Sequence, residues 1–341
     1  MKRHLLVCLL ALAAAWAQAG VGVTDLPGRQ GDGPVTVLYP SSAAEQTVRR
    51  GPFALQLATD GAAVRGNGRL VVMSHGSGGA PWTYTDLARQ FVADGFIVAF
   101  PEHRGDNYKG MGDAGPVSWR RRPGEVSRAV DAVAADPRFA SLLSLDKVGM
   151  YGMSAGGHTA LTMAGGRWSP TVLRDHCEQY LQEDFASCVG LALQLRGNAF
   201  DGLKKTVAMQ VIRYRLDDAS WYSHHDERIQ AVVAEVPFAV DFDLQSLARP
   251  RVPLGIVQAG KDRWLVPRFH SSAVLDACKS CTLVADVPTA GHGSLLSPPP
   301  PRENLGETAA DLLSDPPGFD RALVPPAHAR IVAFFRQHLL P

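Results

Sequence analysis

The chain lacks an excess of charge of either sign. Its 34 lysines and arginines face 33 aspartates and glutamates, so the formal net charge is +1. Proteins that attract nucleic acids or acidic membranes through their electrostatic field carry a basic excess or patch, so no nucleic-acid partner is expected. The densest basic cluster, Arg120, Arg121 and Arg122, adjoins a helical pattern and is expected to be solvated.

The N-terminal apolar run, residues 5–15, is shorter than the ~20 apolar residues that a bilayer-spanning helix needs. It follows a charged start, and the sequence Ala-Gln-Ala over residues 17–19 supplies a cleavage site. This combination predicts a secretory signal peptide over residues 1–19, cleaved after Ala19. A secreted or periplasmic protein without stable membrane insertion is therefore expected.

Cysteine is scarce, and only Cys177, Cys188, Cys278 and Cys281 remain after that cleavage. An even number of cysteines in an oxidising compartment favours disulfides. Of the three possible pairings we expect the local one, which joins Cys177 to Cys188 and Cys278 to Cys281; free buried thiols are the alternative. Only one of these pairs has C-x-x-C spacing, so no metal site is expected.

The sequence contains no internal repeat, and its 46% hydrophobic and 20% charged residues are typical of a globular protein. Two alternating segments near the N-terminus predict antiparallel strands, and the wholly apolar segments that follow alternate with helical patterns. This order predicts a doubly wound, mostly parallel α/β sheet in a single domain over residues 20–341. The predicted strands are 34–40, 53–58, 69–74, 96–101, 147–151, 229–236, 252–260 and 282–287, and the predicted helices are 83–94, 123–135, 155–164 and 327–340.

Two segments break this pattern. Residues 167–225 are rich in tryptophan, tyrosine, cysteine and charge but have no clear strand, which predicts a helical cap or lid inserted above the sheet. The alternative is a peripheral helical excursion that does not contact substrate. The proline clusters at residues 298–301 and 316–317 predict an irregular loop.

The sequence Gly-Met-Ser-Ala-Gly over residues 152–156 follows one of the apolar strands directly. A G-x-S-x-G sequence between a strand and a helix holds a serine in a strained, exposed turn, and the residues two before and two after it must be small. Gly152 and Gly156 meet that requirement. Ser154 is therefore the candidate nucleophile.

A serine nucleophile needs a histidine base and an acid that orients it, in the chain order serine, acid, histidine. His292 follows the last predicted strand in a glycine-flanked loop, and Asp262 ends a buried strand. These two residues are the expected partners of Ser154. Acids near the end of the preceding strand also satisfy the chain order, and they stay open as alternatives: Glu235, Asp241 and Asp243.

Acyl transfer also needs N–H donors for the developing oxyanion. One is expected to be the backbone N–H of Ala155, directly after the nucleophile. The other is expected in the sequence His-Gly-Ser-Gly-Gly over residues 75–79, which follows the first parallel strand. The backbone N–H of Ser77 is the preferred donor, with Gly78 as the alternative.

These motifs, together with Phe-Pro-Glu-His-Arg-Gly over residues 100–105, resemble the α/β-hydrolases, and within them the serine-dependent relatives of dienelactone hydrolase and the platelet-activating-factor acetylhydrolases. The resemblance covers residues 35–340. It implies hydrolysis of a carboxylic ester through an acyl-serine, without a metal or organic cofactor. Dienelactone hydrolase itself has cysteine at the position of Ser154, so lactone specificity does not carry over. The acetylhydrolases tend to place the acid after the earlier strand, which keeps Glu235 and Asp241 open.

We therefore expect a serine carboxylic-ester hydrolase that acts on a small or short-chain acyl ester. Amidase, peptidase or acyltransferase activity on the same triad, or a non-catalytic binding protein with this fold, are the alternatives. The sequence does not indicate the oligomeric state. Aromatic and imidazole side chains that could line the substrate pocket are Trp82, Tyr84, His103, Trp221, Tyr222 and Trp264.

Overall fold

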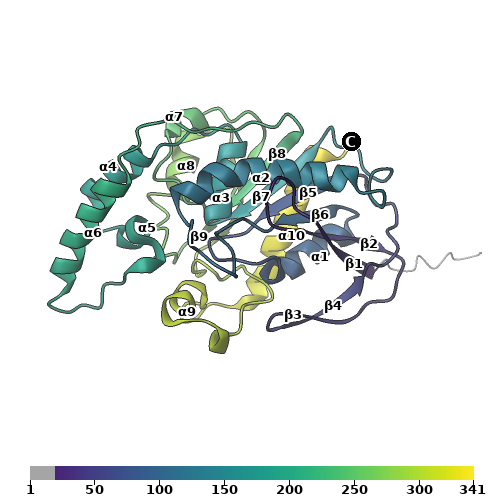
Figure 1. Cartoon of the computed structure of the whole chain (residues 1–341), viewed down its shortest axis with the longest axis horizontal. Helices are drawn as coiled ribbons and strands as arrows, with labels where there is room; N and C mark the ends of the chain where they lie inside the picture. Colours follow the sequence, from purple (N-terminus) through teal and green to yellow (C-terminus); the bar gives the residue numbers. More distant parts are fainter. Residues whose placement is uncertain (1–19) are drawn as a thin grey trace, which may run out of the picture.

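A ten-stranded sheet runs through residues 20–341, the part of the chain that the computed structural model describes (Figure 1). The strand order is β10-β9-β8-β7-β5-β6-β2-β1-β4-β3. The predicted signal peptide lies outside the described residues. The strands are β1 Gly20–Leu26, β2 Val35–Ser41, β3 Gln46–Arg50, β4 Phe53–Thr59, β5 Leu70–Ser74, β6 Ile97–Pro101, β7 Val148–Met153, β8 Ile229–Glu235, β9 Leu254–Ala259 and β10 Thr282–Val287.

The six strands from β6 to β10 in that order pair in parallel, whereas β2 pairs antiparallel with both β6 and β1. Strands β3 and β4 form an antiparallel hairpin at the far edge. The α/β class, the mostly parallel sheet and the antiparallel N-terminal strands are confirmed. β1 and β3 were not predicted, because β1 lies in a glycine-rich segment and β3 is largely exposed.

Helices cover both faces of the sheet (Figure 1). Successive side chains of a strand point to opposite faces, so Leu70 and Val72 of β5 join the core under α2 and α3, whereas Val71 and Met73 join the core under α1 and α10. The helices are α1 Thr85–Ala93, α2 Pro116–Ala135, α3 Ala155–Met163, α4 Pro170–Tyr180, α5 Phe185–Val189, α6 Asp201–Arg215, α7 Leu244–Leu247, α8 Ser271–Ala277, α9 Glu307–Leu313 and α10 Val324–Leu339.

One predicted helix boundary and one predicted loop were wrong. Helix α2 begins at Pro116 rather than Pro123, because Pro116 takes the first helical turn, where a missing N–H costs nothing. The loop expected to be irregular contains the short 3₁₀ helix Arg302–Asn304 and helix α9 between its two proline clusters.

The segment 167–225 contains helices α4, α5 and α6, which project from one side of the molecule in Figure 1. Trp168 and Tyr222 exchange backbone hydrogen bonds of 3.0 and 2.8 Å, which join the two ends of the segment. A disulfide between Cys177 and Cys188 joins α4 to α5. We call residues 167–225 the cap.

The cysteines are paired as the sequence predicts, since a second disulfide joins Cys278 to Cys281. Two disulfides fit a protein that folds in an oxidising compartment, outside the cytoplasm. Among residues 20–341, no helix is both long and apolar enough to cross a membrane.

Candidate active site

Ser154 occupies the turn between β7 and α3. Its φ of 58° and ψ of −117° lie in a region that non-glycine residues rarely adopt. The Ser154 N–H donates to the Glu235 carbonyl at 3.0 Å, and its own carbonyl accepts from Phe238 N–H at 3.2 Å. Backbone hydrogen bonds to the end of β8 and to the segment that follows it thus stabilise the strained turn.

The turn also requires glycine on both sides of the serine. A Cβ atom on Gly152 would lie 1.9 Å from the Gly156 carbonyl oxygen, and a Cβ on Gly156 would lie 1.9 Å from the Ser74 carbonyl oxygen. Both contacts involve backbone atoms that cannot move aside. This close approach is the physical reason for the G-x-S-x-G spacing.

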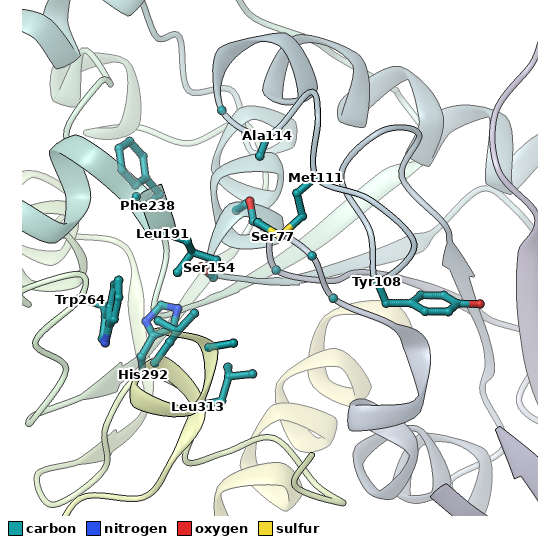
Figure 2. Close-up of a pocket in the computed structure, with 18 of the residues that line it drawn as sticks. Ser77, Tyr108, Met111, Ala114, Ser154, Leu191, Phe238, Trp264, His292 and Leu313 are labelled. Atoms are coloured by element: carbon teal, nitrogen blue, oxygen red, sulfur yellow. The ribbon is translucent and has the colours of Figure 1, made fainter. Parts of the chain in front are cut away.

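His292 and Asp262 form a buried pair at the ends of β10 and β9. His292 Nδ1 lies 2.7 Å from Asp262 Oδ2, and the other carboxylate oxygen accepts from the N–H groups of Trp264 and Leu265, each at 2.9 Å. These two backbone donors fix the carboxylate in orientation. Ser154 and His292 line the same cavity, and Figure 2 shows Ser154 between Ser77 and His292.

The alternative acids contact other groups. Glu235 is buried and accepts from the Tyr151 hydroxyl at 2.9 Å, and burial raises its pKa to about 7. Asp241 lies 3.0 Å from Nε2 of buried His158. Asp243 caps helix α7 and pairs with Arg167 at the surface. Asp262 is the candidate acid that hydrogen-bonds to the His292 ring.

The loop at residues 76–79 offers one free backbone donor. The N–H of Gly76 donates to the Tyr84 hydroxyl at 3.2 Å, that of Gly78 to Asp106 Oδ1 at 3.1 Å, and that of Gly79 to the Gly76 carbonyl at 3.0 Å. The Ser77 N–H has no acceptor among residues 20–341. Because its N–H is free, Ser77 rather than Gly78 is the candidate donor to the oxyanion.

Ala155 supplies a second free donor. It is the first residue of α3, and the first N–H groups of a helix have no intrahelical partner. Both Ala155 and Ser77 line the cavity beside Ser154. Two N–H groups that lie next to a hydroxyl and have no acceptor can donate hydrogen bonds to a developing negative charge.

A buried ion pair holds the loop at residues 76–79 in place. The Arg122 guanidinium donates to Asp106 Oδ2 at 2.8 Å and to the His75 carbonyl at 2.5 Å. Burial alone would raise the pKa of Asp106, but the Arg122 charge holds it below its ordinary value. The expectation that this arginine is solvated is wrong, because Arg122 is fully buried between α2 and the loop.

Three of the candidate pocket residues lie elsewhere. His103 is fully buried, 2.7 Å from the Ser74 hydroxyl and 2.5 Å from Glu125, and burial lowers the pKa of His103. Trp221 is 49% exposed and packs under the Arg167 guanidinium. Neither lines the cavity, and neither does Tyr222, which bridges to Trp168. These predictions were wrong because position in a loop or insertion does not determine which way a ring points.

Trp82, Tyr84 and Trp264 do line the cavity. Most of the other lining residues were not predicted; they come from the cap, the β3–β4 turn, residues 108–119 and α9. The apolar residues of the cap were a signal that could have indicated a wall, but helical spacing alone does not show which face meets the sheet.

No protein-family model matches this chain, and no curated protein matches it. Among residues 20–341, no group of three or more histidine, cysteine or acidic side chains has the geometry of a metal site. The site therefore consists of a hydroxyl on a strained turn, a buried imidazole–carboxylate pair and two free N–H donors around one cavity.

Proposed function

We propose that the protein is an α/β-hydrolase-fold serine hydrolase that cleaves carboxylic esters through an acyl-serine intermediate. The observation that carries the proposal is that Ser154, on its strained turn, shares a cavity with His292, whose other nitrogen is bound by buried Asp262. A serine, a base and an orienting acid in this relation are the machinery of nucleophilic acyl transfer.

In the proposed mechanism, Ser154 Oγ attacks the ester carbonyl carbon while His292 Nε2 accepts the hydroxyl proton. Asp262 stabilises the imidazolium that forms. The carbonyl oxygen becomes negative and accepts hydrogen bonds from the N–H groups of Ser77 and Ala155. When the tetrahedral intermediate collapses, His292 donates its proton to the leaving alcohol. Water then attacks the acyl-serine by the same route, with His292 again acting as base, and releases the carboxylic acid.

We propose a secreted or periplasmic location for this enzyme. The two disulfides support it, because such bonds persist in oxidising compartments. The N-terminal sequence, with its apolar run and Ala-Gln-Ala site, supports the same location.

The proposal is tested by hydrolysis of p-nitrophenyl esters by the purified protein and by its Ser154→Ala variant. We expect the substitution to lower kcat by roughly 10⁴ to 10⁶-fold, as with other serine triads. Ser141→Ala, at an exposed serine outside the cavity, is the matched control and should retain full activity. Full ester turnover by folded Ser154→Ala would overturn the proposal.

Matched anilides and added alcohols separate the related activities. An esterase releases product from the ester much faster than from the anilide, and its rate does not depend on an alcohol acceptor. Saturable binding of ester by the folded protein without any turnover would favour a non-catalytic binding protein instead.

A further inference from the structure

The cavity around Ser154 is larger than a short-chain ester needs. Its volume is about 1370 Å³, whereas pockets that enclose a drug-sized ligand measure roughly 300 to 1,000 Å³. It extends from the cap on one side of Ser154 to the β3–β4 turn, and α9 closes a further side. A butanoyl or acetyl ester would leave most of this volume to water.

The cap side of the cavity is apolar. The chain places branched aliphatic side chains there from α4, α5 and α6 and from the segment between α5 and α6. The disulfide between Cys177 and Cys188 joins α4 to α5 beside this wall. Members of the wall include Leu173, Val189, Leu191, Leu193, Val211 and Ile212. An apolar group that displaces water from such a wall gains binding free energy with each methylene that it buries.

The formal charges around the cavity are of one sign. Arg49 and Arg50 line it at the β3–β4 turn and Arg215 lines it at the end of α6, while no aspartate or glutamate of residues 20–341 lines it. Arg50 pairs with Asp25 at 3.2 Å, outside the cavity. Within residues 20–341, Arg49 and Arg215 form no ion pair. A cationic substrate would therefore meet uncompensated positive charge at both ends of the cavity.

An aromatic face that could hold a cation is already occupied. Tryptophan is the best ring for cation–π binding, and Trp82 lines the cavity close to the loop at residues 76–79. The Arg50 guanidinium lies over this ring at 4.9 Å from its centroid. A quaternary ammonium group would have to displace a side chain of this protein to bind there.

We propose that the substrate is an ester with a large apolar moiety and without positive charge, and that Arg49 and Arg215, the two cavity arginines without an ion pair, select against cationic esters. The inference rests on the proposed function, because it assigns a substrate class to the same site. It goes beyond the expectation of a small or short-chain acyl ester, because it requires a large apolar group on the acyl side or on the alcohol side.

Size selection is tested with two series of neutral thioesters, kept below their aggregation limits. One series lengthens the acyl group from butanoyl to octanoyl, and the other lengthens the thiol in the same way. We expect kcat/KM to rise more than ~30-fold in at least one series, because each buried methylene contributes roughly threefold to fourfold. Flat or falling values in both series would overturn the inference.

Charge selection is tested with three octanoyl thioesters of matched shape, whose thiols end in a trimethylammonium, a tert-butyl or a sulfonate group. We expect the cationic ester to have a kcat/KM at least ~3-fold below that of its neutral isostere, because it meets the like charges of the exposed Arg49 and Arg215, which solvent partly screens. The sulfonate ester should equal or exceed the neutral one. A cationic ester that matches or exceeds its neutral isostere would contradict the proposal.

Charge-reversal variants assign the effect to named residues. The double variant Arg49→Glu and Arg215→Glu should reduce or invert the discrimination against the cationic ester. The matched double variant Arg29→Glu and Arg330→Glu reverses two exposed arginines that do not line the cavity and should leave the discrimination unchanged. Equal effects of the two charge changes would show that net charge, rather than the cavity, governs selection.

The two proposals fail in different ways. Failure of the p-nitrophenyl esters and of every thioester to be hydrolysed by folded protein, with no covalent labelling of Ser154 by a fluorophosphonate, would overturn the proposed function and this inference with it. Labelling of Ser154 and hydrolysis of esters without the expected size and charge preferences would overturn this inference alone.

Discussion

His292 Nδ1 lies 2.7 Å from Asp262 Oδ2, and neither side chain is more than 2% exposed. A carboxylate at this distance fixes the neutral tautomer in which Nδ1 carries the proton, so that Nε2 can accept one. The other oxygen of Asp262 is held by the N–H groups of Trp264 and Leu265. The imidazole is thus oriented by a carboxylate that is itself fixed in place.

Substitution of the acid distinguishes Asp262 from Glu235. Asp262→Asn retains the shape but removes the acceptor that holds the tautomer, so we expect kcat to fall by roughly 10³ to 10⁴-fold. Glu235→Gln preserves the hydrogen bond from Tyr151 and should lower kcat by less than ~10-fold. Steady-state kinetics on one ester measures the kcat of both variants. A larger loss for Glu235→Gln than for Asp262→Asn would assign the orienting role to Glu235.

The buried ion pair between Arg122 and Asp106, which holds the loop at residues 76–79, is predicted to affect kcat. Asp106→Asn leaves the buried Arg122 guanidinium without its counter-charge, which costs about 3 to 5 kcal/mol of stability. If the loop shifts, the Ser77 N–H no longer meets the oxyanion, and kcat should fall by up to ~10²-fold while KM changes little. Kinetics at a temperature where circular dichroism shows a folded variant tests this expectation.

Two control variants accompany that measurement. Asp113→Asn removes a carboxylate that pairs with partly exposed Arg121 and should leave kcat unchanged. Ser77→Ala keeps the backbone donor while it removes the hydroxyl that donates to Asp106 at 3.2 Å, so its effect should stay below ~10-fold. A larger loss for Ser77→Ala than for Asp106→Asn would indicate that the hydroxyl, not the backbone, contacts substrate.

The raised pKa of Glu235 should make the stability of the protein depend on pH. Burial raises its pKa from 4.5 to about 7, so between these values the native state binds this proton more tightly than the unfolded chain does. The contribution is complete below pH 4.5 and is lost as the pH rises through about 7, a change of about 3 kcal/mol in the free energy of unfolding. Glu235→Gln should remove it.

Urea unfolding of the two proteins at pH 5 and pH 8 measures this difference. We expect Glu235→Gln to be more stable relative to the parent protein at pH 8 than at pH 5. The same difference at both values would show that Glu235 has an ordinary pKa in the folded protein.

The turn at Ser154 and the imidazole–carboxylate pair could be predicted because each follows a recognisable apolar strand. Gly152 is required by a backbone contact with Gly156 in the same turn, although the contact that requires Gly156 is with Ser74 of β5. Asp262 and His292 follow strands whose apolar runs can be recognised in the sequence. The parallel core could be predicted for the same reason, since buried strands differ in composition from their surroundings.

Residues whose environment depends on distant parts of the chain could not be placed in this way. Arg122 is buried because Asp106, sixteen residues earlier, faces it across the loop. His103 is taken out of the cavity by Glu125 of α2 and by Ser74 of β5. In each case, a partner brought close by the fold determines the burial of a polar side chain.

The measurement that tests the central claim most directly is covalent labelling with a fluorophosphonate, followed by mass spectrometry of the labelled peptide. The account predicts one label per chain, on Ser154, formed at a rate that falls when an ester substrate competes. The Ser154→Ala variant should take up no label under the same conditions. Label on another serine, or no label on folded protein that still hydrolyses the ester, would contradict the assignment of Ser154 as the nucleophile.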